Sequence, residues 1–239
     1  MDITTDKLSI SIFFPMYNDE HTIESLIQET ISALRPITND YEIIIIDDSS
    51  EDATGNIADR ICLENNSIRV IHHNENRGYG GAVKSGLAHC SKNLIFYTDG
   101  DKQYDVRELK KLLAKIKEAD VVTGYKIERC DPFYRIIIGN IYRSIVNNLF
   151  GLKIKDSTCD FRLFKKEAID SIKIESNSGF ICIEMMKKIQ EKGYKIAEVG
   201  VHHFPRNFGN SQSFKLRRII SMIKDLCMQW IKYLRNGRL

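Results

Sequence analysis

Short apolar runs alternate with amphipathic stretches along most of this chain. The apolar runs are rich in β-branched and aromatic residues, as buried strands are, and they cover Ser9–Phe14, Tyr41–Ile46, Ser67–His72, Leu94–Tyr97, Ala119–Thr123 and Tyr194–Phe204. Apolar residues recur with a helical period over His21–Leu34, Ala53–Asn65, Ala82–Cys90, Val106–Lys117, Tyr134–Phe150, Lys165–Ile172 and Phe180–Lys192. This alternation predicts an α/β fold with a mostly parallel central sheet that is covered on both faces.

Three of the predicted strands run directly into polar segments, which are Pro15–Glu20, Asp47–Thr54 and Thr98–Gln103. Ligands of open α/β sheets bind outside the carboxyl ends of the strands, so we expect these segments to rim one crevice. Pro15 should end the first strand, because proline lacks the N–H that a sheet needs. The polar stretch Asp156–Arg162 is expected to be a turn.

The C-terminal stretch from Leu216 onward has apolar residues at a 3.6-residue period, which predicts an amphipathic helix. Residues 213–239 carry one acid, Asp225, and seven basic residues, namely Lys215, Arg217, Arg218, Lys224, Lys232, Arg235 and Arg238. Because the whole chain has a net charge of +3, residues 1–212 sum to −3. We therefore predict one domain over 1–212 and a basic helix over 213–239. This helix either lies on a membrane surface or docks on the body or on a second subunit.

Composition narrows the class of protein. The chain is 43% hydrophobic and 28% charged, which is ordinary for a globular protein. No apolar run is long enough for a membrane-spanning helix, and the N-terminus lacks the features of a signal peptide. The six cysteines are scattered without metal-binding spacing, which predicts reduced thiols in a cytoplasmic protein. A nucleic acid partner is not expected, because the body of the chain is mildly acidic.

The segment Asp99-Gly100-Asp101-Lys102-Gln103 is the strongest candidate for metal chemistry. In an extended chain residues i and i+2 point the same way, so Asp99, Asp101 and Gln103 would converge. Two carboxylates and an amide oxygen suit Mg²⁺ or Mn²⁺. The alternative is a solvated turn. The glycine-rich stretch near Gly78 matches neither the dinucleotide-binding nor the P-loop pattern.

Seven motifs occur in a recognisable order. They are Pro15-x-Tyr17-Asn18, Asp47-Asp48-x-Ser50-x-Asp52-x-Thr54, Asn76-x-Gly78-x-Gly80-x-Ala82-x-x-x-Gly86, Asp99-x-Asp101-x-Gln103, Thr158-Cys159-Asp160-Phe161-Arg162, a helix around Glu184, and Arg206-x-x-Gly209-x-Ser211. Together they resemble family 2 glycosyltransferases, in the branch similar to dolichyl-phosphate mannose synthases. The resemblance covers about residues 8–212. Each motif is weak singly, but their order is specific.

The resemblance implies a GT-A fold, which is a nucleotide-binding α/β sandwich, and a nucleotide-sugar donor. The implied contacts to the donor are Pro15, Tyr17 and Asp48 at the base and ribose, Arg77 nearby, and Arg206 and Ser211 over the phosphates. Asp99, Asp101 and Gln103 would hold the Mg²⁺ or Mn²⁺ that bridges the diphosphate, and Asp160 and Arg162 would lie on the acceptor side.

The chain departs from that branch at three positions. Asp19 followed by Glu20 replaces the usual glutamate, so either carboxylate is a candidate for the nucleotide contact. Asp160 stands where a glycine is common, and Gln212 where a lysine is often found. The sugar and the acceptor of that branch are therefore not carried over to this chain.

The function we expect is metal-dependent, inverting transfer of a sugar to a polyprenyl phosphate or lipid-linked glycan at the membrane surface. A polyprenyl phosphate is already anionic and needs no strong base, whereas a hydroxyl acceptor would make Asp160 the best candidate for a general base. The alternatives are a soluble or polysaccharide hydroxyl acceptor, nucleotidyl transfer, and a catalytically silent adaptor. We expect a cytoplasmic protein, peripheral on the inner face of the membrane, and homo-oligomers are an open alternative.

Overall fold

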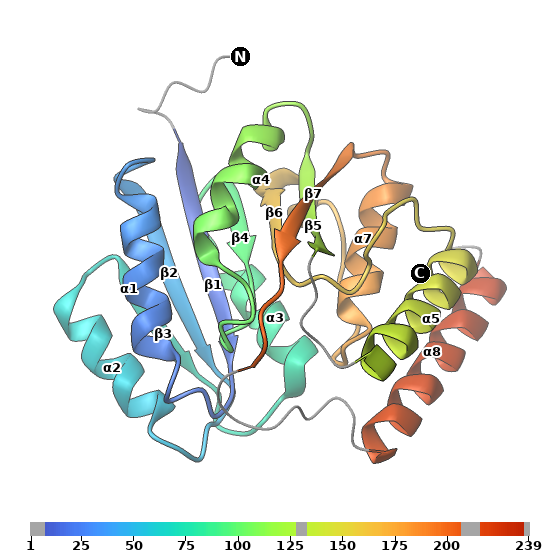
Figure 1. Cartoon of the computed structure of the whole chain (residues 1–239), viewed down its shortest axis with the longest axis horizontal. Helices are drawn as coiled ribbons and strands as arrows, with labels where there is room; N and C mark the ends of the chain where they lie inside the picture. The colour runs from blue at the N-terminus through green and yellow to red at the C-terminus, as the bar shows by residue number, and fades with distance from the viewer. Residues whose placement is uncertain (1–7, 128–132, 207–215, 237–239) are drawn as a thin grey trace.

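The computed structural model describes residues 8–127, 133–206 and 216–236 (Figure 1). The strands are β1 (Ser9–Met16), β2 (Asp40–Asp47), β3 (Ile68–His72), β4 (Leu94–Tyr97), β5 (Val121–Ile127), β6 (Arg162–Lys165) and β7 (Ile196–His202). The helices are α1 (Ile23–Leu34), α2 (Thr54–Glu64), α3 (Gly78–His89), the 3₁₀ turn η2 (Val106–Glu108), α4 (Leu109–Ile116), α5 (Phe133–Phe150), α6 (Lys166–Asp170), α7 (Ile181–Glu191) and α8 (Leu216–Asn236).

The strands form one seven-stranded sheet in the order β3-β2-β1-β4-β6-β5-β7. β6 runs antiparallel to its neighbours β4 and β5, and every other pair is parallel. The predicted mostly parallel sheet is therefore confirmed. Among the described residues, no helix is both long enough and apolar enough to cross a membrane.

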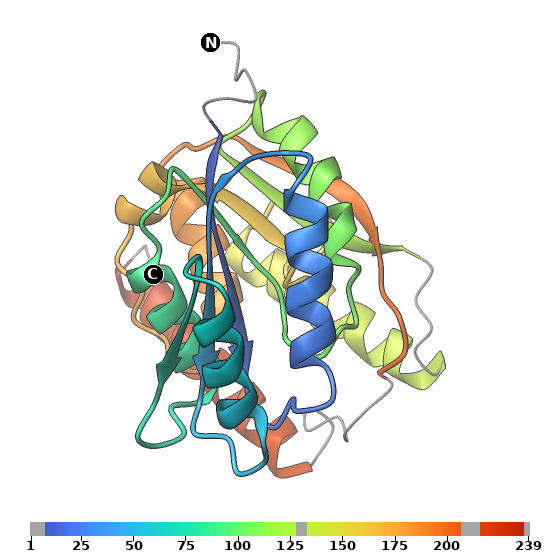
Figure 2. The same ribbon diagram turned by 90° about the vertical axis from the view of Figure 1, so that its left-hand side faces the viewer.

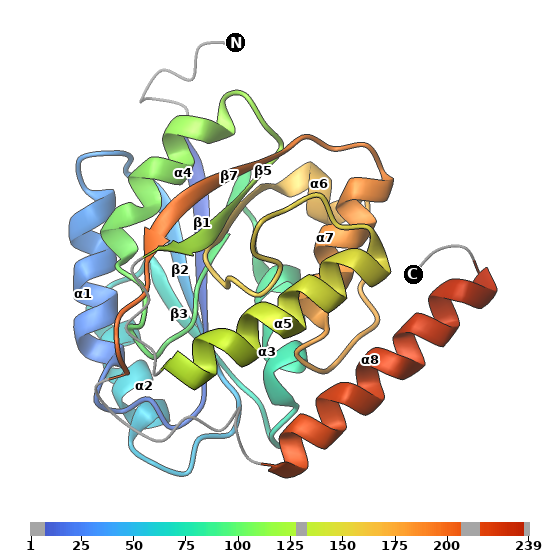
Figure 3. The ribbon, with the colours of Figure 1, turned by 45° about the vertical axis from the view of Figure 1, so that its right-hand side comes forward.

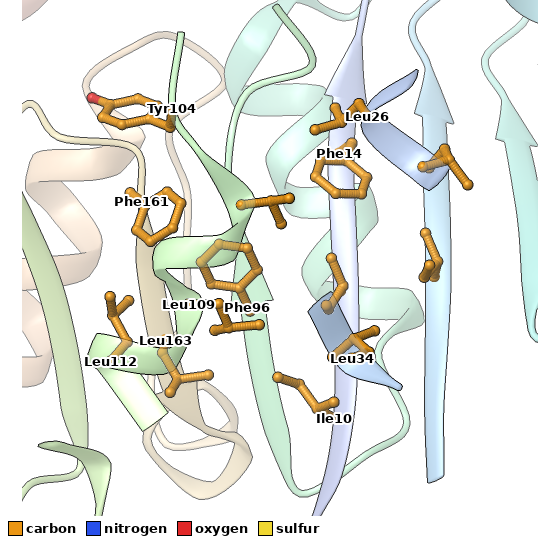
Figure 4. Close-up of a cluster of buried hydrophobic side chains, with 14 of the residues drawn as sticks. Ile10, Phe14, Leu26, Leu34, Phe96, Tyr104, Leu109, Leu112, Phe161 and Leu163 are labelled. Carbon is orange, nitrogen blue, oxygen red and sulfur yellow. The ribbon is translucent and has the colours of Figure 1, made fainter. Parts of the chain in front are cut away.

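The central strands are apolar on both faces because both faces are covered by helices. In β2, Ile43 and Ile45 belong to one core, whereas Ile44 and Ile46 belong to the other. Side chains of a strand alternate between faces, so a continuous isoleucine run supplies two cores at once. Figure 4 shows part of the first core, where Phe14 and Phe96 meet residues of α1, α4 and β6.

The two cores correspond to two helical layers (Figure 2). α1, α2 and α4 cover one face of the sheet, and α3, α6 and α7 cover the other. α5 and α8 lie beside each other over this second layer (Figure 3). The rings of Trp230 and Tyr233 on α8 contact Phe150 of α5, with centroids 5.6 Å and 5.8 Å apart.

The C-terminal helix is present as predicted, and its described part docks on the body. Leu226 is buried, and Lys232 pairs with Glu175 across the contact. Docking on the body was one of the two alternatives that the sequence left open. Met228, Ile231 and Leu234 remain exposed on α8, so an apolar side of this helix still faces outward.

Two predictions about the strands are wrong. β1 does not end before Pro15 but continues to Met16, with Pro15 opposite Ile46 in the register. The pairing of β1 with β4 ends at Phe13, so at Pro15 the strand has a partner on one side only, and a missing N–H can be tolerated there. The expected turn and helix over Asp156–Ile172 also miss β6, the short antiparallel strand that fills the gap between β4 and β5.

Helix α3 begins at Gly78, four residues earlier than predicted, so the glycine-rich stretch forms its first turn. A Cβ on Gly80 would lie 2.4 Å from the backbone carbon of Asn177. A Cβ on Gly86 would lie 2.1 Å from a ring carbon of Phe13. These two glycines therefore allow α3 to pack directly against the 177–178 loop and against β1.

Candidate active site

The loops that follow β1, β2 and β4 share an unusual backbone geometry. Asn18, Ser49 and Lys102 have φ values of 57°, 62° and 57°, and they are the three non-glycine residues with positive φ among those described. Each lies in one of the three polar segments that were predicted to rim a crevice. Such conformations cost free energy and tend to occur at functional sites.

The loops after β1 and β2 are joined by hydrogen bonds. The backbone N–H of Asn18 donates to Ser50 Oγ (3.1 Å), and that of Asp19 donates to Thr54 Oγ1 (2.9 Å). Glu20 accepts from the backbone N–H of Ala53 (2.9 Å) at the start of α2. Glu20 is thus committed to a structural contact, and Asp19 is the carboxylate that remains for the crevice.

Asp19 meets the loop after β4. A Cβ on Gly100 would lie 3.2 Å from Asp19 Oδ2 and 2.8 Å from Met16 Cγ, so the glycine between Asp99 and Asp101 lets the two loops approach. The segment after Tyr97 is a turn and not an extended strand, so the argument from i, i+2 spacing was wrong. The turn closes when Asp101 Oδ1 accepts from the backbone N–H of Gln103 (3.1 Å).

The electrostatics of this cluster disfavour negative charge. Burial, with repulsion from Asp160 and Asp101, raises the pKa of Asp99 well above its usual range. Burial also raises the pKa of Asp101, although nearby Arg206 opposes the shift. Burial raises the pKa of Asp19 to about 6, with the Tyr17 backbone hydrogen bond acting against it. The carboxylates of Asp19, Asp99 and Asp101 therefore lie close together in a region that is shielded from water.

Arg206 lies against these acids. Its Nη2 is 3.4 Å from Asp101 Oδ2 and 3.8 Å from Asp19 Oδ1. The segment before it is held to the β4 loop, because the Phe204 N–H donates to the Gln103 carbonyl (2.8 Å) and Gln103 Nε2 donates to the Phe204 carbonyl (3.1 Å). Ser211, the other predicted phosphate contact, lies outside the described residues.

Asp160 approaches the same cluster from the second half of the chain. Its Oδ1 accepts from the thiol of Cys182 (2.9 Å) and lies 3.4 Å from the hydroxyl of Tyr97. Its negative charge contributes to the raised pKa of Asp99. Asp160 therefore lies close to the carboxylates after β4, and its place on the acceptor side stays a prediction.

Arg162 does not reach the crevice. It is fully buried, and its guanidinium donates to the backbone carbonyls of Cys159, Cys182 and Ser157 at 2.8–3.0 Å. Its hydrogen bonds join the Asp160 segment to the start of α7. A direct contact with an acceptor does not fit this geometry, and Arg162 instead holds Asp160 and Cys182 in place.

The predicted base and ribose contacts lie around the ends of β1 and β2. Tyr17 is 37% exposed, whereas Pro15 is buried within β1 and offers little contact area. Asp48 is buried and sits between the loop of Tyr17 and the start of α3, where the backbone N–H of Arg77 donates to it (2.8 Å). The Arg77 side chain itself is exposed.

The carboxylates after β4 fit a divalent cation. Oδ1 of Asp99 is sealed from solvent and has no hydrogen-bond partner among the described residues. A buried carboxylate oxygen without a donor, beside a second carboxylate, fits a hard cation. The described residues contain no cluster of three or more His, Cys, Asp or Glu side chains at metal-binding spacing. The protein would therefore supply Asp99 and Asp101, and a bound diphosphate would supply further oxygens.

Two contributors were missed by reasoning from the sequence. Lys126, near the end of β5, is close enough for its charge to oppose the raised pKa of Asp99 and of Asp101. His73, after β3, lies 2.6 Å from Asp48. The sequence marks His72-His73 as histidines near a strand end that are usually structural, and it gives Lys126 no signal, because only the folded sheet brings these residues to the acids.

Comparison with known proteins identifies relatives. The family model described as glycosyl transferase family 2 matches residues 11–173. Glycosyltransferase AglD of Haloferax volcanii is 27% identical over 239 positions, which cover 95% of this chain and 38% of that protein. The chain thus spans well under half the length of this relative.

Solved structures of glucosyl-3-phosphoglycerate synthase from Mycobacterium tuberculosis share the fold. The complex with Mn²⁺, UDP and glucosyl-3-phosphoglycerate has a TM-score of 0.69 and 19% identity, and covers 97% of this chain and 81% of that one. The complex with Mg²⁺ and UDP has a TM-score of 0.68 and 19% identity, and covers 92% and 79%. At this identity the likeness establishes the fold alone.

Proposed function

This chain belongs to glycosyl transferase family 2, and from that premise we propose that it transfers a sugar from a nucleotide-sugar donor to an acceptor in one inverting displacement. The observation that carries the proposal is the meeting of Asp19, Asp99, Asp101 and Asp160 at the carboxyl ends of the strands, with Arg206 against them. Buried acids that repel one another are suited to bind a divalent cation, and that cation can in turn bind a diphosphate.

Each residue of the site has a separate proposed role in the transfer. Tyr17 and Asp48 would bind the base and ribose, and Asp99 and Asp101 would hold Mg²⁺ or Mn²⁺, with Gln103 closing their turn. The metal, when bound, offsets negative charge on the leaving diphosphate. Arg206 would turn from the acids to the phosphates, because a guanidinium binds phosphate oxygens in a bidentate manner. Asp160 would face the incoming acceptor oxygen.

We further propose that the acceptor is a lipid-linked phosphate presented at a membrane surface, as in the dolichyl-phosphate mannose synthase-like branch. Exposed apolar side chains on two neighbouring helices support this, and those on α5 include Phe133, Ile138, Ile141 and Ile145, which are 46–76% exposed. α8 adds Met228, Ile231 and Leu234. We call these seven side chains the α5/α8 face. Apolar patches of this kind mark interaction surfaces.

The charge of the two helices favours an anionic bilayer as the partner of the α5/α8 face. α5 carries two basic residues and no acid, and α8 carries five basic residues and one acid. Basic amphipathic helices bind anionic lipid surfaces. The same face would otherwise serve a second copy of this chain. A cytoplasmic location and peripheral attachment remain predictions.

A first experiment tests the transfer. Release of nucleoside diphosphate from a panel of nucleotide sugars should require Mn²⁺ or Mg²⁺ and an added polyprenyl phosphate. Asp101→Ala should abolish the metal-dependent reaction without loss of folded protein, and Asp170→Asn, which changes an exposed carboxylate on α6, should leave it intact. Normal turnover by the Asp101 variant would refute the proposed site. Metal-dependent release of pyrophosphate from nucleoside triphosphates would instead indicate a nucleotidyltransferase.

A second experiment tests the membrane surface. The full chain should co-sediment with vesicles that contain anionic lipid and much less with neutral vesicles. The double variant Ile138→Ser and Ile141→Ser should reduce this binding, whereas Leu63→Ser, at an 88% exposed site on α2, should not. Equal sedimentation of all three proteins would remove the membrane role. A shift in oligomeric state on changing the two isoleucines would assign the face to a second copy.

A further inference from the structure

Cys182 and Tyr97 lie behind the carboxylate of Asp160, and both reach the same oxygen of it. Oδ1 accepts a hydrogen bond from the thiol of Cys182 at 2.9 Å, and the hydroxyl of Tyr97 donates to it at a longer 3.4 Å. The hydroxyl and the sulfur are themselves 3.7 Å apart. Burial, with the charge of Asp160, raises the pKa of the Cys182 thiol well above its usual range, so the sulfur keeps its proton and acts as a donor.

Both donors are held in place by the core. Tyr97 is fully buried in β4, and its ring stacks on Phe13 and Phe164 with centroids 5.1 Å and 6.1 Å apart. Cys182 is buried in the first turn of α7, where its carbonyl accepts from Nη1 of Arg162 at 3.0 Å. The two donors therefore form a rigid support, and a carboxylate that turned away from them would leave both without this partner in the core.

The other oxygen of Asp160 is left for a ligand. No donor among the described residues reaches Oδ2, and Oδ2 is not one of the unpartnered oxygens that are sealed from solvent. Asp160 itself is only half-buried, in contrast to Cys182 and Tyr97 behind it. The charge of Asp160 raises the pKa of both Asp99 and Asp101, so its carboxylate lies near the two proposed metal ligands.

We propose that Cys182, assisted by Tyr97, is the positioning residue that turns Asp160 toward the acceptor. The inference rests on the proposed function, in which Asp160 faces the incoming acceptor oxygen. With Oδ1 held from inside the fold, Oδ2 is the oxygen that accepts a hydrogen bond from an acceptor oxygen that still carries a proton. As this acceptor oxygen bonds to the anomeric carbon and the bond from that carbon to the diphosphate breaks, its proton passes to Oδ2.

Because Cys182 acts only through Asp160, its loss should have a particular kinetic pattern. Without the thiol, the carboxylate keeps only the longer contact to Tyr97 and can rotate. A reacting group that is misplaced by about 1 Å can lower a rate by roughly a hundredfold. We therefore expect kcat to fall. The KM for the nucleotide sugar should not change, because other residues are proposed to bind the donor.

Transfer from a panel of nucleotide sugars to added polyprenyl phosphate, with Mn²⁺, tests this pattern in the full chain. Cys182→Ala should lower kcat by roughly tenfold or more and leave the KM for the nucleotide sugar within about twofold. Cys182→Ser, whose hydroxyl can donate to Oδ1, should restore most of the rate. Tyr97→Phe, which removes the longer contact, should have a smaller effect than Cys182→Ala.

Cys90→Ala is the matched control for the loss of a buried thiol. Cys90 is as buried as Cys182, and its thiol donates to the Gly86 carbonyl at 3.1 Å, away from the crevice. This variant should keep the wild-type kcat. A loss of rate in Cys90→Ala as large as that in Cys182→Ala would show that the effect comes from packing and would overturn the positioning role.

The infrared S–H stretch provides a measurement that does not depend on turnover. The band that disappears in Cys182→Ala belongs to this thiol, and the band that disappears in Cys90→Ala belongs to the control thiol. Because a charged acceptor forms the stronger hydrogen bond, the Cys182 band should lie at the lower frequency. In Asp160→Ala it should move to higher frequency, and an unchanged band in that variant would overturn the contact.

The kinetic results separate the inference from the function beneath it. Normal kcat in Cys182→Ala, or a serine variant that is no faster than the alanine variant, would overturn the positioning role and leave the transferase proposal standing. If wild type transfers no sugar from any nucleotide sugar, the proposed function fails and the role of Cys182 in transfer fails with it. The infrared band would then still decide whether the thiol holds Asp160.

Discussion

Replacement of Asp19 by asparagine should stabilise the fold, and the gain should depend on pH. Burial, with repulsion from Asp101 and Asp52, raises the pKa of this carboxyl from 3.8 to about 6, although the Tyr17 N–H and Arg206 favour its charged form. The Asp19 side chain is 11% exposed, so water screens the carboxylate only weakly. The folded chain therefore carries an unfavourable charge at neutral pH.

The size of the effect follows from linkage. Between about pH 4 and pH 6 the folded protein keeps a proton on Asp19 that the unfolded chain has lost. Stability thus falls as the pH rises through this window, and the loss is complete above the folded pKa. A difference of roughly two pH units corresponds to about 3 kcal/mol. Asparagine is neutral at every pH in this range, and its carbonyl oxygen can accept the hydrogen bond from the Tyr17 N–H. The stability of the asparagine variant should therefore not fall between pH 4 and pH 6.

Urea denaturation at pH 4, 5.5 and 7.5 measures the difference, in buffer without divalent metal because a bound cation would offset the repulsion. The asparagine variant should gain up to ~3 kcal/mol at pH 7.5, less at pH 5.5 and nothing at pH 4. Asp170→Asn is the matched control, since its carboxylate is 56% exposed. If the Asp19 variant is no more stable than wild type at pH 7.5, or differs from it equally at all three values, the electrostatic reasoning is wrong.

Three further changes test the packing that supports the site. Gly86→Ala would place a Cβ 2.1 Å from the Phe13 ring and should cost about 3 kcal/mol, which a lowered melting temperature would reveal. Arg162→Met should cost at least ~3 kcal/mol in urea denaturation, because three buried carbonyls lose their donors, and a loss below ~1 kcal/mol would contradict that role. Trp230→Ala removes the ring that contacts Phe150 and should speed proteolytic release of α8, whereas cleavage at the wild-type rate would show that the helix docks by other contacts.

The alternation of apolar residues was enough to predict the main strands, because each central strand carries its own signal for burial. β6 could not be found this way. It is four residues long, Arg162 and Lys165 are its ends, and its strand geometry depends on pairing with β4 and β5. Only the gap between those two strands makes this short segment extended. Its physical cause is tertiary and leaves no local pattern.

The sequence predicts that the polar segments after the strands lie together, but it does not predict which side chains contact each other there. The sequence left Asp19 and Glu20 equivalent, and the cap that Glu20 forms on Ala53 decides between them. Asp48 and His73 are 25 positions apart, and the parallel register of β2 and β3 brings them together. Such pairings follow from register, which the composition of each strand does not specify.

The residues that are proposed to bind the metal and the donor also destabilise the folded chain. Asn18, Ser49 and Lys102 hold strained backbone conformations, and Asp101 repels both Asp19 and Asp99 in a region that is shielded from water. A cation with a diphosphate would relieve the repulsion, so binding should stabilise the folded chain more at pH 7.5 than at pH 5, where protons already relieve part of it. The isoleucine-rich β2 and the two cores on either side of it keep the strand ends in place despite this repulsion, because a packed sheet cannot spread its loops apart without opening both cores.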